Sequence, residues 1–69
     1  MNLVEARIRK RKTQWDLRKI TGINQTKVSL IENGYVEPTE KEKVMIAEAL
    51  GFNVGEIEWP SGEISNLRL

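Results

Sequence analysis

The chain has 69 residues, which suffice for one domain and leave no room for a second. It contains neither cysteine nor histidine, so the sequence excludes disulfides and thiolate chemistry and lacks the commonest general base and metal ligand. The formal net charge is +1, yet residues 1–31 carry eight Lys and Arg against two acidic residues, a net +6, whereas residues 32–69 carry three against eight, a net −5.

The first helix is predicted over residues 2–11. Leu3 and Ala6 lie on one stripe at helical spacing, with Ile8 beside it. Residues 9–12 are all basic and should lie at the end of this helix and in the link to the next one, where they face water or phosphate.

The second helix is predicted between Thr13 and Gly22. Thr13 and Asp16 fit the S/T-x-x-D/E pattern of a capping box, which favours a helix start at this point. Gly22 ends the helix, because glycine adopts the left-handed conformation of a helix C-terminus at low cost. A tight turn then leads to the third helix.

The third helix is predicted over residues 25–33, with Asn24 as its N-cap and Gly34 closing it. At 100° per residue, Val28 and Ile31 define its inward side. Two helices joined by so short a turn form a helix-turn-helix, whose second helix commonly enters the DNA major groove.

The outward side of the third helix centres on Thr26, Leu30 and Asn33, with Gln25 and Lys27 on its margins. Ordinary exposed surface is one interpretation of these side chains. An outward leucine would also suit contact with a thymine methyl group. A single exposed leucine is common, however, so Leu30 alone is weak evidence for DNA binding.

The fourth helix is predicted over residues 40–50. Pro38 disfavours helix at the residue before it, and Thr39 with Glu42 then forms a second capping box. Three apolar residues at helical spacing are expected to form the inward face of this helix: Val44, Ala47 and Leu50.

A short fifth helix is predicted after Asn53, which with Glu56 gives a third capping pattern. The sequence thus predicts an all-α, compact five-helix domain over residues 1–60. Residues 61–69 form a tail that is apolar in part. The tail either folds back on the domain, makes a dimer contact together with Trp59, or is a frayed terminus.

One pattern runs through nearly the whole chain. It comprises Thr13-Gln14, Leu17, Gly22-Ile23, Gln25, Val28-Ser29, Ile31-Glu32, Asn33-Gly34, Ile46-Ala47, Leu50-Gly51 and Ile57. These residues resemble the helix-turn-helix domain of lambda-type phage repressors and related bacterial regulators, the Cro/repressor or xenobiotic-response-element (XRE) family. The resemblance implies a lambda-repressor-like DNA-binding fold. Arg18 departs from the family, which usually has alanine at this helix crossing, so either its stem lies along the crossing or the second helix is tilted.

The resemblance also implies which residues contact the bases of DNA. Gln25 matches the family's principal base-reading glutamine, which can bond N6 and N7 of adenine together. Thr26, Lys27 and Leu30 are the other candidates for base readout on the third helix, and Lys27 is equally a candidate for a phosphate contact.

Further residues are candidates for contacts to the DNA backbone. Gln14 matches a family residue that contacts phosphate and braces the reading glutamine, at a helix N-terminus that itself favours anions. The indole N–H of Trp15 could reach a phosphate, although partial burial against the first helix is the simpler interpretation. Asn33 and the backbone at Tyr35 are candidates by resemblance.

Arg7 matches a family arginine that pairs with the acidic residue at the end of the third helix, here Glu32. We interpret this pair as structural and not catalytic. The sequence has no glycine-rich phosphate loop and no evident carboxylate pair on one face, so we expect neither an enzyme nor a cofactor or metal site.

The sequence therefore predicts a double-stranded DNA-binding protein with sequence specificity, whose basic half attracts the polyanion by its local field. We expect a homodimer on a pseudo-palindromic operator, with half-sites about 34 Å apart. Repression by occlusion of a promoter is expected, and activation stays open because nothing in the sequence fixes the sign. A protein-binding module of the same fold, such as an antitoxin or adaptor, is the alternative. Without a membrane-spanning run or a signal-peptide core, we expect a cytoplasmic protein.

Overall fold

The computed structural model describes residues 1–60, and the predicted tail of residues 61–69, with its expected dimer contact, lies outside them. Four helices and one 3-10 turn follow in chain order: α1 (Leu3–Arg9), α2 (Gln14–Thr21), α3 (Gln25–Glu32), α4 (Glu40–Leu50) and η1 (Val54–Glu56). The predicted all-α class is confirmed for this part of the chain. None of its helices has the length and apolar character needed to cross a membrane.

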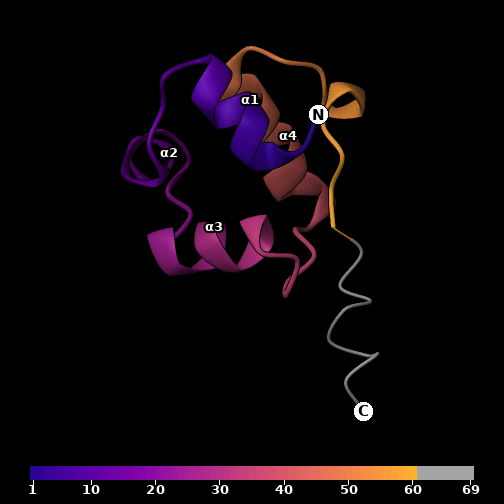
Figure 1. Cartoon of the computed structure of the whole chain (residues 1–69). Helices are drawn as coiled ribbons and strands as arrows, with labels where there is room; N and C mark the ends of the chain where they lie inside the picture. Colours follow the sequence, from indigo (N-terminus) through magenta and orange to yellow (C-terminus); the bar gives the residue numbers. More distant parts are fainter. Residues whose placement is uncertain (61–69) are drawn as a thin grey trace.

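The arrangement leaves α3 on the outside of the domain. In Figure 1, α3 lies along the bottom of the helical domain, below α1 and α4, and α2 lies at the left, above the left end of α3. The link between α1 and α2 begins at the upper left, at the end of the domain opposite α3, and descends to α2. The N-terminus lies beside η1, where Asn2 and Glu58 form an isolated parallel bridge.

The predicted fifth helix is wrong in its type, since residues 54–56 form only a single 3-10 turn. Glycine at position 55 disfavours a regular helix. Immediately after the turn, Ile57 is extended, and the N–H of Glu58 donates to the carbonyl of Met1 at 2.7 Å. Pairing with the N-terminal segment therefore draws the chain out of the helical conformation after one turn.

Side-chain caps determine where the helices begin. The Thr13 hydroxyl accepts a hydrogen bond from the Asp16 N–H at 3.0 Å, while the Asp16 carboxylate accepts one from the Thr13 N–H at 2.9 Å. The corresponding box at the start of α4 is also present. A further box, Asn2 with Glu5, starts α1 and was not among the predicted ones. Each cap contributes about 1 kcal/mol, enough to fix the start of so short a helix.

Three of the helices end in the same hydrogen-bonding pattern. A residue with positive φ follows each: Arg11 at 55° after α1, Gly34 at 80° after α3 and Gly51 at 77° after α4. In each case the next N–H donates to the carbonyl five residues earlier, at 2.9 Å. This is the Schellman motif, in which glycine is the usual residue at positive φ. Among residues 1–60, Arg11 is the one residue other than glycine in that conformation.

The core lies between the four helices and is closed by the chain after η1. Its buried members are Leu3, Ala6, Leu17, Ile23, Val28, Ile31, Ile46, Ala47, Leu50 and Ile57. The predicted inward residues of α3 are therefore correct. The prediction for α4 is wrong at Val44, which is 42% exposed, whereas Ile46 is fully buried. Val44 precedes Ile46 by two positions, or about 200° around the helix, so the two cannot share a face.

Candidate nucleic-acid interface

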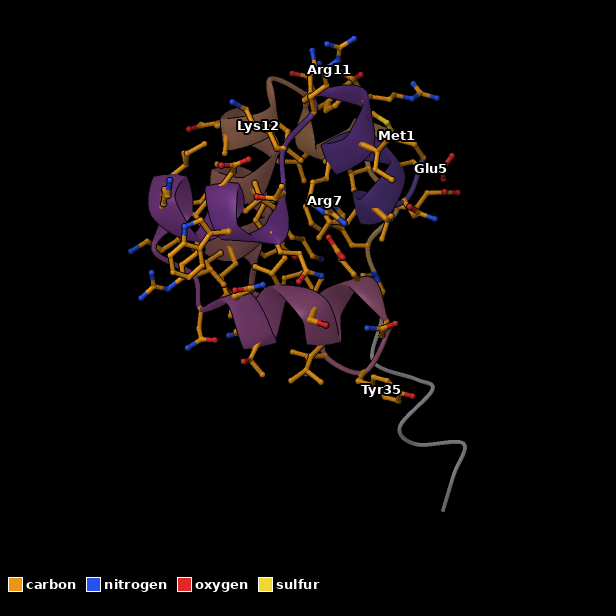
Figure 2. All side chains as sticks on the ribbon, turned by 60° about the vertical axis from the view of Figure 1, so that its left-hand side comes forward. Met1, Glu5, Arg7, Arg11, Lys12 and Tyr35 are labelled. Atoms are coloured by element: carbon orange, nitrogen blue, oxygen red, sulfur yellow. The ribbon has the colours of Figure 1, made fainter. Side chains whose placement is uncertain are left out.

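The outer face of α3 carries exposed side chains that point away from the domain (Figure 2). Gln25, Thr26 and Leu30 are all exposed, and Leu30 retains 39% of its surface. Val28 and Ile31 on the opposite side are almost fully buried, so packing fixes how α3 is rotated about its axis. The three candidate base-reading residues therefore stand together on one open face.

A shallow depression lies between the start of α2 and α3. It is lined by Gln14, Gln25, Thr26, Ser29 and Leu30. The fold thus brings Gln14 beside the outer face of α3, although 11 positions separate it from Gln25 in the sequence. A ligand held in this depression would touch side chains that can donate and accept hydrogen bonds, together with one apolar group.

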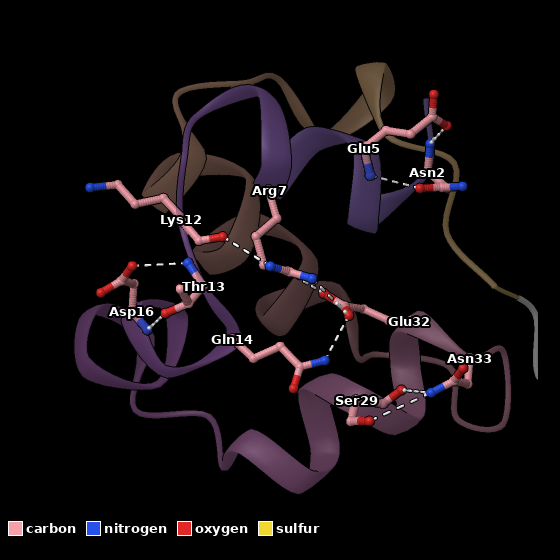
Figure 3. Close-up of polar contacts among 10 residues, drawn as sticks. All are labelled: Asn2, Glu5, Arg7, Lys12, Thr13, Gln14, Asp16, Ser29, Glu32 and Asn33. Atoms are coloured by element: carbon pink, nitrogen blue, oxygen red, sulfur yellow. Dashed lines mark hydrogen bonds and ion pairs between the residues drawn. The ribbon is translucent and has the colours of Figure 1, made fainter.

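The predicted ion pair between Arg7 and Glu32 is present (Figure 3), with Nε of Arg7 2.7 Å from Oε2 of Glu32. Only 17% of the Arg7 side chain and 5% of the Glu32 side chain are exposed. Arg7 also donates through Nη1 to the carbonyl of Lys12 at 3.0 Å. This pair joins α1 and the link after it to the end of α3.

Glu32 has a second partner that the sequence did not reveal. The side-chain amide of Gln14 donates to Oε1 of Glu32 at 2.7 Å. One N–H of the Gln14 side-chain amide is therefore already engaged. Figure 3 shows the carbonyl oxygen of the same amide directed toward α3. Because a carbonyl oxygen repels phosphate and accepts from donors, Gln14 is arranged to orient a neighbouring amide or a base amino group.

Lys27, predicted on the margin of the outer face of α3 as a candidate for base readout or a phosphate contact, is engaged within the domain. Its ammonium lies 2.7 Å from a carboxylate oxygen of Glu42, in the first turn of α4. Glu42 also accepts from the N–H of Thr39. The hydrogen bond from Lys27, ahead of those from Thr39, holds the pKa of Glu42 below its ordinary value. Lys27 therefore ties α3 to α4, because an opposite charge lies beside it on the neighbouring helix.

Trp15 is 47% exposed, next to Gln14 at the start of α2. The guanidinium of Arg18 lies over its ring, 4.8 Å from the ring centre. Of the two interpretations of Arg18, the structure favours the one with its charge in solvent, since the residue is exposed on α2. Trp15 is thus about half covered, with Arg18 over its ring, and a contact of its indole N–H with phosphate stays a prediction.

The residues after α3 are less available to phosphate than predicted. The N–H of Tyr35 donates to the carbonyl of Leu30 at 2.9 Å, and that of Gly34 donates to Ile31 at 3.1 Å. These backbone donors belong to the Schellman motif and have partners within the domain, and the phosphate contact at Tyr35 stays a prediction. Asn33 is exposed, with its amide donating to the Ser29 carbonyl at 2.8 Å.

Trp59 was the described residue expected to support a protein contact with the tail. Its indole N–H donates to the carbonyl of Val54 at 3.1 Å, and its ring packs partly against the core. Trp59 therefore has an evident structural role in closing the domain.

Comparisons of the chain with protein-family models, with curated proteins and with solved structures found no match.

Proposed function

We propose that the protein binds double-stranded DNA with sequence specificity through the outer face of α3, and thereby regulates transcription. The observation that carries this proposal is the joint exposure of Gln25, Thr26 and Leu30 on a helix fixed by its buried side. The depression shared with Gln14 adds a second element to the same face.

The dimensions of α3 suit the DNA major groove. A helix with its side chains is about 10–12 Å across, which fits the groove width of about 12 Å, and the eight residues of α3 extend over about 12 Å. Gln25 can make paired hydrogen bonds to adenine, worth about 1–3 kcal/mol of discrimination against another base. Leu30 offers an apolar contact to a thymine methyl group. Lys27 contributes by holding α3 in place, through its pair with Glu42, and is withdrawn from base readout.

The proposal includes the partner and the mode of action suggested by the resemblance to lambda-type repressors. One α3 makes few base contacts, so two copies on a pseudo-palindromic operator would double the specific contacts, with half-sites about 34 Å apart. Occlusion of a promoter in the cytoplasm is the simplest regulatory consequence of such binding.

The test is selection of bound duplexes from a random pool, followed by titration of the selected site at two salt concentrations. We expect an enriched motif and an affinity that falls as the salt concentration rises. Gln25→Ala should relax the preference at one position in each half-site by about 1–3 kcal/mol, or roughly 5- to 150-fold. Lys41→Ala, an exposed residue on α4, is the control and should leave the preference unchanged.

Two results would contradict the proposal. A pool without an enriched motif would exclude sequence-specific binding. An intact preference after Gln25→Ala would show that α3 does not read the bases as proposed. A protein-binding module of the same fold would give no DNA-dependent signal at either salt concentration.

A further inference from the structure

The strongest positive surface of the described residues is not on α3. The end of α1 and the link to α2 carry four consecutive cations, and Lys19 on α2 is the fifth; together we call them the α1–α2 corner. Its members are Arg9, Lys10, Arg11, Lys12 and Lys19. Figure 2 shows Arg11 at the top of the molecule, Lys12 in its upper part and α3 at the bottom, so these two cations lie on the side of the domain away from the proposed DNA-binding face.

The corner has little acidic compensation. Elsewhere in residues 1–60, Arg7, Lys27 and Lys43 each pair with a glutamate, while Arg18 and Lys41 are single exposed cations without an ion pair in that range. No member of the corner forms an ion pair within the same range. Asp16, which is bound to Thr13 in the capping box of α2, keeps its negative charge near Lys12 and Lys19 and offsets part of theirs. The remaining positive charge of the corner, chiefly that of Arg9, Lys10 and Arg11, is available to an external anion.

Two local features hold these cations in place. Arg11 stands at φ 55°, where glycine occupies the corresponding positions after α3 and α4. A left-handed residue other than glycine costs about 1 kcal/mol or more, so the chain tolerates strain that glycine would remove. Next to it, the ammonium of Lys10 lies 4.8 Å from the centre of the Phe52 ring, which fixes the direction of that side chain.

We propose that the α1–α2 corner binds the phosphodiester backbone of a second duplex DNA segment, distinct from the segment that faces α3. This inference rests on the proposed function. Arg11 lies at the end of the domain opposite α3, so its charge faces away from a duplex docked along α3. Duplex DNA presents a charge every 1.7 Å or so and is bound by cations alone, whereas a protein partner needs an apolar centre to its interface. The corner consists of basic residues and suits the first kind of partner.

The experiment uses two duplexes and the full chain. The selected operator is fixed to beads, and a fluorescent duplex of unrelated sequence is added with increasing protein. The wild-type protein should capture the fluorescent duplex on the operator beads. Arg9→Gln with Arg11→Gln should lower that capture at least about tenfold at 0.1 M salt and reduce its salt slope by about two, since two phosphate contacts are removed. Operator binding itself should change less than twofold.

Lys41→Gln is the matched control, because Lys41 is an exposed cation on α4 and outside the corner. It should leave capture unchanged. Arg11→Gly is a second variant that removes a corner charge and relieves the backbone at once, so loss of folding cannot explain its effect. It should lower capture by at least about threefold, in proportion to one lost contact.

The outcomes separate this inference from the proposed function. Sequence-specific operator binding without capture, or capture that survives Arg9→Gln with Arg11→Gln, would overturn the corner and leave the function of α3 intact. Capture that disappears in Gln25→Ala but not in the corner variants would assign it to the two α3 faces of a dimer, which also overturns the inference. Binding of unrelated duplexes that depends on the corner, with no enriched motif, would support the corner and refute the proposed function.

Discussion

Glu32 is the residue on which the positions of Arg7 and Gln14 both depend. Its carboxylate accepts hydrogen bonds from the two side chains at 2.7 Å each and is almost fully buried. Arg7 belongs to α1 and Gln14 to α2, so one side chain from α3 connects three helices. The proposed interface therefore rests on a group that would not itself touch DNA.

Replacing Glu32 by glutamine should lower the free energy of unfolding by about 3 kcal/mol. The variant leaves the guanidinium of Arg7 without a counter-charge, and the cost lies at the low end for buried pairs because Arg7 retains some solvent contact. Urea unfolding measures it. Glu40→Gln is the control: its carboxylate pairs with Lys43 at 3.3 Å but is 88% exposed, and we expect a change within about 0.5 kcal/mol. Equal effects of the two variants would show that burial of the pair is unimportant.

The helix ends show which features of the fold were readable from the sequence. The boxes at Thr13 and Thr39 depend on residues three positions apart, so the pattern alone identifies them. The end of α1 has no comparable signal, because Arg11 occupies a position at which the sequence rule expects glycine. Similarly, the N-terminal pairing of Glu58 that stops η1 is a long-range contact, which a local pattern cannot reveal.

Arg11→Gly should stabilise the domain by about 1 kcal/mol, since it removes the steric cost of a left-handed arginine. For a domain of this size, the midpoint of thermal unfolding should rise by about 4–8 °C. Gly51→Ala provides the opposite case at the same position of the motif. An added Cβ there would meet Lys10 only at ordinary contact distance, so its expected loss of about 1 kcal/mol comes from the backbone at φ 77°. An unchanged or lower unfolding midpoint for Arg11→Gly would mean that the arginine side chain makes a stabilising contact that offsets its backbone strain.

At the scale of the whole molecule, charge is distributed differently from what the sequence indicates. The sequence places a net +6 in residues 1–31, the half that contains the predicted helix-turn-helix. The structure separates these cations: Arg7 and Lys27 are neutralised by Glu32 and Glu42, while Arg11 and Lys12 of the corner lie away from α3.

The side of α3 that faces outward could be predicted from the helical periodicity of its apolar residues. The partners of Gln14 and Lys27 could not, because they depend on how α3 sits against α1 and α4, beyond any local spacing.

The attachment of α3 to α4 makes a prediction about acid stability. The pKa of Glu42 is lowered in the folded protein, first by the hydrogen bond from Lys27. The folded state therefore binds a proton at Glu42 less readily than the unfolded state does. The stabilisation that ionised Glu42 gives the folded protein is fully present above the ordinary pKa of 4.5, and it is lost as the pH falls through the lower pKa of the folded state. Unfolding of the wild type should become easier as the pH is lowered from 6 to about 3.

Glu42→Gln should be less stable than the wild type at pH 6 and should lose less stability on acidification, because its side chain does not titrate. Glu48→Gln, an exposed position on α4 without an ion pair within residues 1–60, should follow the wild-type profile. Parallel pH profiles for wild type and Glu42→Gln would show that the Lys27–Glu42 pair does not hold the two helices together.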